Sequence, residues 1–207
     1  MQEDNVSQQG QMHHAHVSLV DENDNVIGSC NKYDAHRTDP GPRLHRAFSL
    51  FLFDDSGRLL LQQRAPTKLT FPLIWANTCC SHPEPEEPLF NAAIRRVKFE
   101  VGLDIDESNG LFELGAFRYM AQSGEWTEYE IDHVIFGKYN GPVDNVNQDE
   151  VFNTKWVTKE EFEDWIAREP EVISPWLRKI WSHWLNKNWN ITAGEVEKSS
   201  GVVNLME

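Results

Sequence analysis

Histidine and glutamate side chains recur at positions from which they could bind one divalent cation. His36, His45 and His82 lie in or beside loops next to expected strands, and Glu128 and Glu130 stand two residues apart in an alternating segment. A strand repeats every two residues, so both carboxylates would point to the same face. Three imidazoles and two carboxylates suit a six-coordinate ion such as Zn²⁺ or Mn²⁺. Taken singly, each histidine is more often an ordinary surface or core residue, and spacing alone does not bring the five together.

The segment N-T-C-C-S-H-P, at residues 77–83, raises a second chemical question. Its adjacent cysteines, Cys79 and Cys80, could belong to a metal site, a nucleophile, a redox pair or an ordinary loop, because buried thiols are commonly inert. With Cys30 the chain has three cysteines and no C-x-x-C spacing. This pattern argues against a zinc finger, a thioredoxin-type motif and a secreted disulfide framework.

The elements that must position these residues form a strand-rich pattern with one central helix and two C-terminal helices. Alternating apolar residues around a turn cluster predict a first hairpin, and Asp55-Ser56-Gly57 predicts the turn of a second. The first strand of the second hairpin is apolar on both sides, so we expect it to be central in a sheet. Pro40, Gly41 and Pro42 predict a loop between the hairpins. Helical periodicity and capping residues predict the helices. The expected strands are 16–20, 26–30, 47–53, 59–64, 111–122, 127–139 and 154–157, and the expected helices are 87–102, 159–170 and 174–190.

Domain organisation follows from the same pattern. We expect an α+β fold, with a mixed sheet flanked by helices, an N-terminal β-hairpin and C-terminal helices. Residues 1–13 are expected to be a flexible tail, residues 14–190 a single domain, and residues 191–207 a second tail.

Charge and hydropathy exclude several classes of protein. The net charge of −14 argues against a surface that binds nucleic acid through its phosphates, although basic residues could still gather around a small anion. The longest apolar run, at 47–53, is too short to cross a membrane, and the polar, acidic N-terminus is unlike a signal peptide. We therefore expect a cytoplasmic protein, with a monomer as the expected state.

The expected central helix resembles a degenerate Nudix box, G-x5-E-x7-R-E-U-x-E-E-x-G-U, where U is aliphatic. The residues that stand at its glycine, glutamate and arginine positions are Ser81, Glu87, Arg95, Glu100 and Gly102. Arg96 and Phe99 replace two of the usual glutamates. Nudix hydrolases use that carboxylate cluster to hold divalent metals, so the resemblance implies the fold more strongly than hydrolysis.

The order of several longer motifs resembles type 1 isopentenyl diphosphate isomerase, a family with the Nudix fold that does not hydrolyse diphosphates. The resemblance covers about residues 16–185 and rests on these segments: D-A-H-R-T-D-P-G-P-R-L-H, L-L-L-Q-Q-R-A-P-T-K, F-P-L-I-W-A-N-T-C-C-S-H-P, A-A-I-R-R-V-K-F-E-V-G, E-Y-E-I-D and S-P-W-L. It implies a 1,3-proton shift that interconverts isopentenyl and dimethylallyl diphosphate through a tertiary carbocation.

Site roles carry over from the family motif by motif. The resemblance implies that Cys80 and Glu130 are the acid and base, with Tyr119 and Trp176 as active-site aromatics. It implies one divalent metal (Zn, Mn or Mg) and a Mg²⁺ that enters with the substrate diphosphate and is held by Glu100 and the Cys80 carbonyl. The implied ligands of the first metal are His36, His45, His82, Glu128 and Glu130. The implied diphosphate-binding residues are Lys32, Arg64, Lys68, Ser81 and Arg96.

Two alternatives compete with an isomerase. A Nudix diphosphohydrolase would need the carboxylates that Arg96 and Phe99 replace. A noncatalytic module of the same fold would need neither Cys80 nor Glu130, and the chain has both.

Overall fold

Long strands and short helices alternate along most of the chain. The computed structural model describes residues 8–191, 194 and 201–206. The helical elements are α1 Gln8–His14, α2 Lys32–His36, α3 Leu89–Val101, η1 Glu107–Asn109, α4 Lys159–Arg168, η2 Pro170–Val172, α5 Pro175–Ile180 and the π-helical η3 Trp181–Leu185. The strands are β1 His16–Val20, β2 Val26–Asn31, β3 His45–Phe53, β4 Leu59–Arg64, β5 Trp75–Ala76, β6 Cys79–Ser81, β7 Phe112–Ser123, β8 Trp126–Lys138, β9 Val151–Val157 and β10 Val202–Asn204.

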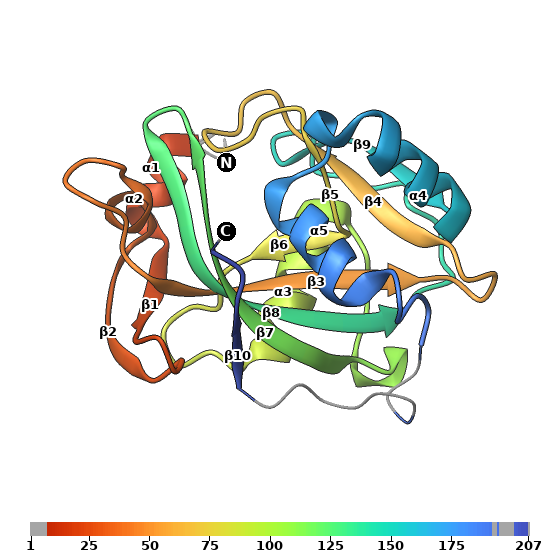
Figure 1. Ribbon diagram of the computed structural model, residues 1–207, viewed down its shortest axis with the longest axis horizontal. Helices are drawn as coiled ribbons and strands as arrows, with labels where there is room; N and C mark the ends of the chain where they lie inside the picture. Colours follow the sequence, from red (N-terminus) through yellow and green to blue (C-terminus); the bar gives the residue numbers. More distant parts are fainter. Residues whose placement is uncertain (1–7, 192–193, 195–200, 207) are drawn as a thin grey trace, which may run out of the picture.

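Strand β3 is the centre of a mixed sheet in the order β10-β7-β8-β3-β1-β2 (Figure 1). It runs parallel to β8 from His45, opposite Glu130, to Phe53. It also pairs antiparallel with β6, where Ser49 lies opposite Cys80. Strands β6 and β8 therefore bring residues far apart in sequence to the same stretch of β3.

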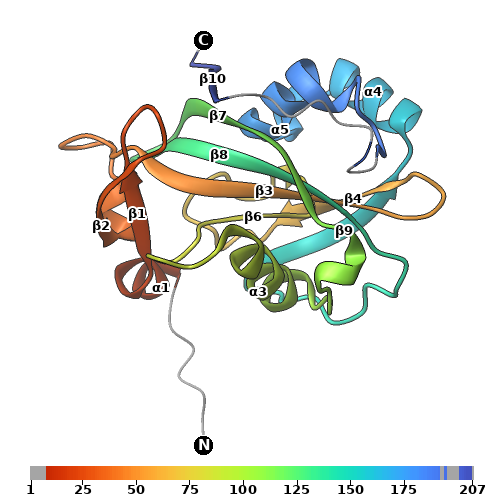
Figure 2. The ribbon, with the colours of Figure 1, turned by 90° about the horizontal axis from the view of Figure 1, so that it is seen from below.

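Helices cover both faces of the sheet, with α4 and α5 on one side and α3 on the other (Figure 2). Alternate residues of β3 point to the two layers, so Phe51 packs towards Leu177 of α5 while Leu50 packs towards Val97 of α3. All three side chains of the run Leu50–Leu52 are fully buried. This agrees with a central strand, and the predicted α+β fold with a helix-flanked mixed sheet is confirmed.

The predicted helix signals have the expected local geometry. Thr158 and Glu161 form both hydrogen bonds of a capping box at the start of α4. The Ser174 side chain caps α5, whose first residue is Pro175. Helix α3 ends at Gly102, which has φ +75°, and a Cβ atom there would lie 2.3 Å from the Asn145 carbonyl oxygen. Only glycine fits this position without strain.

Several segments differ from the sequence-based expectation. The predicted helix 174–190 ends at Leu185, with a π-helical last part, and the short strands β5 and β6 were not predicted. The predicted loop before β3 begins with helix α2, because the Asn31 side chain accepts a hydrogen bond from the Asp34 amide and caps a short helix. Residues 8–14 form α1, and residues 202–204 pair in parallel with Ala116–Arg118 of β7. The domain boundaries themselves stay a prediction. Most of the predicted tails, residues 1–7, 192–193, 195–200 and 207, lies outside the described residues.

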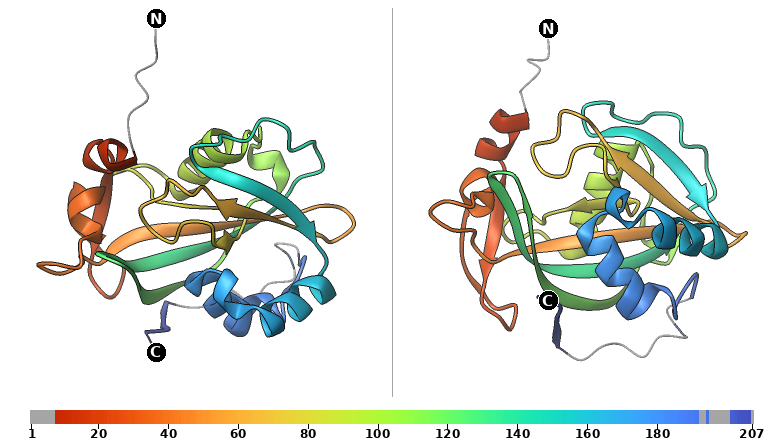
Figure 3. Two further views of the ribbon diagram at one scale, coloured as in Figure 1. Left: turned by 90° about the horizontal axis from the view of Figure 1, so that it is seen from above. Right: turned by 45° about the horizontal axis from the view of Figure 1, so that its top comes forward.

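The hairpin of β1 and β2 lies with α1 and α2 at one end of the molecule (Figure 3). Its turn is fastened to the central sheet by His133 of β8, whose Nε2 atom is 3.0 Å from Asp24 and whose Nδ1 atom is 2.6 Å from Glu113. Arg46 adds a hydrogen bond of 2.9 Å to Asp24. Among the described residues, no helix is both long and apolar enough to cross a membrane.

Candidate active site

The five predicted metal ligands converge at one end of β3. Their candidate ligand atoms all lie within 4.8 Å of one another, and the residues are His36 of α2, His45 of β3, His82 after β6, and Glu128 and Glu130 of β8. His36 Nε2 is 3.0 Å from Glu128, and His82 Nε2 is 2.9 Å from Glu130. The cluster forms because the parallel register places Glu130 beside His45.

The imidazole rings are oriented as metal ligands. The Nδ1 atoms of His36 and His45 donate to the carbonyl oxygens of Lys32 and Arg43, at 2.8 and 2.7 Å. These contacts turn both Nε2 atoms towards the carboxylates, and such backbone contacts are typical of metal-bound histidines. The buried Nε2 atom of His36 lies 3.0 Å from the Glu128 carboxylate, but it makes no hydrogen bond of acceptable geometry with any described residue. A cation among these lone pairs would satisfy them, so the residues fit a divalent metal.

The surroundings of these side chains favour the protonation states in which they can bind a metal. Burial lowers the pKa of His36, and it lowers that of His82 well below the ordinary value. Burial raises the pKa of Glu130, but interactions with neighbouring groups, first among them His45, outweigh it and lower the pKa to about 2. His36 and His82 are therefore neutral and Glu130 is ionised at neutral pH, as metal binding requires.

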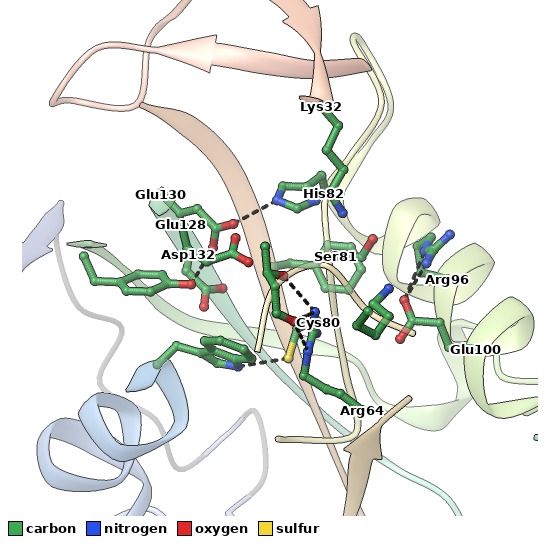
Figure 4. Close-up of a pocket in the computed structure, with 15 residues that line it drawn as sticks. Lys32, Arg64, Cys80, Ser81, His82, Arg96, Glu100, Glu128, Glu130 and Asp132 are labelled. Carbon is green, nitrogen blue, oxygen red and sulfur yellow. Dashed lines mark hydrogen bonds and ion pairs between the residues drawn. The ribbon is translucent and has the colours of Figure 1, made fainter. Parts of the chain in front are cut away.

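The Cys80 side chain lies across β3 from Glu128 and Glu130, and all three line the same pocket (Figure 4). Its thiol donates to Asn77 Oδ1 at 2.8 Å and accepts from the Trp176 indole N–H at 3.1 Å. Burial raises the pKa of the Cys80 thiol, which is therefore protonated at neutral pH. Cys79 points to the opposite layer and is fully buried in the core beside α3.

Tyr119 and Trp176 both line the pocket. The Tyr119 hydroxyl donates to Glu130 Oε2 at 2.7 Å, because β7 pairs with β8 so that these two residues are opposite. The Trp176 ring lies 6.5 Å from that of Tyr119 and 5.5 Å from that of Phe71. The pocket wall therefore combines the Cys80 thiol, four carboxyl groups, among them that of Glu130, and aromatic rings.

The five predicted diphosphate-binding residues line the same pocket: they are Lys32, Arg64, Lys68, Ser81 and Arg96. Burial lowers the pKa of Lys32 to about 8. Arg64 also has a structural contact, since its guanidinium donates to the carbonyl oxygens of Thr70 and Phe71 at 3.0–3.2 Å. Four cations in one pocket of an acidic protein are typical of an anion-binding site.

Three residues that line the pocket or contact its lining were not predicted: Asp132 lines it, whereas Asn77 and Glu150 contact Cys80 and Lys68. Asn77 and Glu150 carry no local signal, and Glu150 was unexpected as the partner of Lys68, at 2.5 Å. Asp132 could have been found by extending the two-residue repeat of Glu128 and Glu130 by one step. It accepts a hydrogen bond of 2.7 Å from Ser49, and burial, followed by the charge of Glu130, raises its pKa well above the ordinary value.

The Nudix-box residues divide between the pocket and the protein surface. Glu87 binds Arg95 through two hydrogen bonds of 2.7 and 2.6 Å, outside the metal-ligand cluster. Arg96 points into the pocket and binds Glu100 at 2.6 Å, whereas Phe99 is 46% exposed. The carboxylate cluster of a hydrolase is therefore absent from the described helix α3.

Comparison with known proteins agrees with this geometry. Residues 43–180 match the NUDIX domain. A Nocardia farcinica protein named isopentenyl-diphosphate Delta-isomerase is 45% identical over 166 residues, which cover 79% of this chain and 91% of the relative. The chain belongs to the isopentenyl-diphosphate Delta-isomerase family. The resemblance that the sequence motifs predicted is thereby confirmed.

Other isopentenyl-diphosphate Delta-isomerases are also similar. The enzyme named isopentenyl-diphosphate Delta-isomerase I from Camptotheca acuminata is 40% identical, over 83% of this chain and 81% of the relative. Solved structures match in fold. A Deinococcus radiodurans protein superposes with a TM-score of 0.59 and 22% identity, over 73% of this chain and 88% of that one. A MutT protein from Methanosarcina mazei gives 0.54 and 17%, over 70% and 95%.

Proposed function

We propose that the protein interconverts isopentenyl diphosphate and dimethylallyl diphosphate by a 1,3-proton shift, as a step of isoprenoid biosynthesis. Membership of the isopentenyl-diphosphate Delta-isomerase family supports the reaction. The structural observation that best supports this reaction is a single pocket lined by the Cys80 thiol, the Glu130 carboxylate and a group of cationic side chains. An acid, a base and an anion-binding site are what this proton shift needs.

The proposed chemistry places the alkene between Cys80 and Glu130. One of these groups adds a proton to the terminal carbon, which leaves a tertiary cation, and the other removes a proton from the opposite end of the allylic unit. Two strands that flank β3 provide them, so a substrate lying along β3 would meet one group on each side. The family favours the glutamate side as the first donor, with the Tyr119 hydroxyl, 2.7 Å from Glu130, assisting. That role needs a proton on Glu130 and a thiolate at Cys80, whereas the ionised Glu130 and protonated Cys80 described above are the pair that acts in the reverse direction.

Trp176 and the diphosphate-binding residues complete the proposed site. The indole ring would stabilise the cation through its π face, by about 2 kcal/mol or more when water is excluded. Lys32, Lys68 and Arg96 would hold the diphosphate, with Arg64 and Ser81 beside them. The buried aromatic wall would keep water from capturing the cation as an alcohol.

Divalent cations would supply positive charge at two places when bound. At the first, Zn, Mn or Mg would orient the Glu130 carboxylate and change its acidity; its ligands would be His36, His45, His82, Glu128 and Glu130. At the second, Glu100 and the Cys80 carbonyl would hold a Mg²⁺ that enters with the diphosphate. A cytoplasmic location, a monomeric state and action on a small molecule without a nucleic-acid partner stay predictions from the sequence.

Deuterium incorporation tests the proposal. Purified protein is incubated with isopentenyl diphosphate and Mg²⁺ in D₂O, and the products are followed by NMR. We expect dimethylallyl diphosphate that carries solvent deuterium, and a rate about 10²–10⁴-fold lower in Cys80→Ala, because that variant lacks one acid–base group. Cys79→Ala is the matched control, since its thiol faces the α3 layer and its loss should leave the reaction nearly unchanged.

Two outcomes would contradict the proposal. Release of phosphate or of the monophosphate would assign the protein to the hydrolases. Absence of any conversion with metal restored would leave a binding module as the better explanation.

A further inference from the structure

Asn77 contacts both the proposed acid–base thiol and the proposed cation-stabilising indole. It follows β5 and is fully buried. Its Oδ1 atom accepts hydrogen bonds from the Cys80 thiol at 2.8 Å and from the Trp176 indole N–H at 3.0 Å. The two groups that it joins are 96 residues apart in the chain and come from different elements, β6 and α5.

The orientation of the Asn77 amide is fixed from its other end. Its Nδ2 atom donates to the carbonyl oxygen of Leu50 at 3.1 Å and to that of Cys79 at 3.0 Å. Turning the amide over would place Oδ1 against these two acceptors and leave the Cys80 and Trp176 donors facing an NH₂ group. Buried groups that lose their partners are costly, so the amide holds one orientation.

We propose that Asn77 is a positioning residue that sets the direction of the Cys80 thiol proton and the tilt of the Trp176 ring. The inference rests on the proposed function, because it assigns Asn77 a role in that same reaction. Cys80 has two contacts that restrict rotation of its S–H bond, one to Asn77 and one from Trp176. The indole has its N–H edge anchored on Oδ1 and on the sulfur, and Phe71 packs edge-on against it. Asn77 therefore preorganises both groups without itself facing the substrate.

Position matters here because proton transfer to and from carbon tolerates little misalignment. A displacement of about 1 Å at a reacting group can cost on the order of 10²-fold in rate. Asn77→Leu keeps a similar volume and removes the amide. We expect kcat to fall by about 10²-fold, and KM to stay within about threefold because the cations that hold the diphosphate are untouched.

Thr78→Val is the matched control for lost buried hydrogen bonds. Thr78 is the next residue and is also fully buried. Its hydroxyl donates to the Leu60 carbonyl oxygen at 2.7 Å and accepts from the Leu52 amide at 2.9 Å, so it contacts the backbone and neither Cys80 nor Trp176. Both variants are expected to lose stability, and only Asn77→Leu is expected to lose kcat with KM retained.

The indole resonance gives a readout that is independent of turnover. In a ¹H–¹⁵N spectrum, Trp176→Phe identifies the Trp176 N–H peak among the eight tryptophans. That peak should move in Asn77→Leu and stay in place in Thr78→Val. If Asn77→Leu does not fold, Asn77→Ser serves instead, because its hydroxyl is too short to join both partners.

The inference is overturned if Asn77→Leu or Asn77→Ser keeps the kcat of Thr78→Val, or if the Trp176 peak does not move. A wild-type protein that makes no dimethylallyl diphosphate would instead refute the proposed function, while the resonance would still report whether Asn77 holds the indole.

Discussion

The His133 contact predicts that stability falls as pH rises from about 6 to about 10. Burial lowers the pKa of His133, but its hydrogen bonds to Asp24 and Glu113 and their charges outweigh burial and raise the pKa from 6.5 to about 9. A histidine whose folded pKa is raised contributes stability that is fully present below the unfolded pKa and is lost as pH rises through the folded pKa. The loss should therefore occur between about pH 6.5 and just above pH 9.

The magnitude follows from that interval. At about 1.36 kcal/mol per pH unit, the difference between 6.5 and about 9 corresponds to about 3.4 kcal/mol as an upper bound. The Glu113 side chain is 36% exposed, and solvent screens its interaction with the ring. We therefore expect the His133 contribution to be about 1–2 kcal/mol.

Urea unfolding at about pH 6 and about pH 10 measures this contribution. His133→Gln should be less stable than the wild type at the lower pH, and the gap between them should shrink by about 1–2 kcal/mol at the higher pH. His183→Gln is the control, because His183 is exposed on the C-terminal helical segment, and its gap should not change. An equal gap for His133→Gln at both pH values would refute the reasoning.

Three further predictions concern the metal-ligand cluster, the acid–base pair and the end of α3. A chelator should lower the unfolding temperature, and added Zn²⁺ or Mn²⁺ should restore it. With the metal at about a hundred times its Kd, the gain in stability should be about 2–3 kcal/mol. A thermal-shift experiment that shows no such change in the wild type would contradict the metal site. Tyr119→Phe should lower kcat by about 10-fold or more without unfolding the protein, because Glu130 loses its phenol donor; steady-state kinetics that match the wild type would exclude this role. Gly102→Ala should lower the free energy of unfolding, measured with urea, by more than about 2 kcal/mol, because the new Cβ meets the Asn145 backbone. Gly110→Ala is the control: it has open space around it and should lose about 1 kcal/mol. Equal losses would show that the close approach is unimportant.

Local sequence signals were sufficient for most elements of the fold. Alternation identified the long strands, and the capping box of Thr158 with Glu161 located the start of α4. Strand β10 could not be predicted, because three residues with no period pair only through a distant partner, β7. Helix α2 was missed because one side chain, Asn31, nucleates it among loop-forming residues.

Local sequence signals also predicted part of the proposed site. Histidines and paired carboxylates are visible as residue types, and the family motifs indicated which of them to group. Their meeting point depends on the β3–β8 register, which no local pattern encodes. Asn77 was missed because its role consists of contacts with Cys80 and Trp176, and an asparagine after a short strand has no such meaning in the sequence alone.

The close approach of Gly102 to Asn145 bears on how sequence searches for activity should be designed. Gly102 is needed by the chain path, and the ion pair of Glu87 with Arg95 fastens the loop before α3 to the helix. Gly102, Glu87 and Arg95 therefore serve the fold, whatever reaction a protein with this fold catalyses. A search pattern weighted towards them would retrieve this architecture whatever its chemistry, whereas one weighted towards the positions of Arg96 and Phe99 would separate diphosphate-splitting members from those that move a proton.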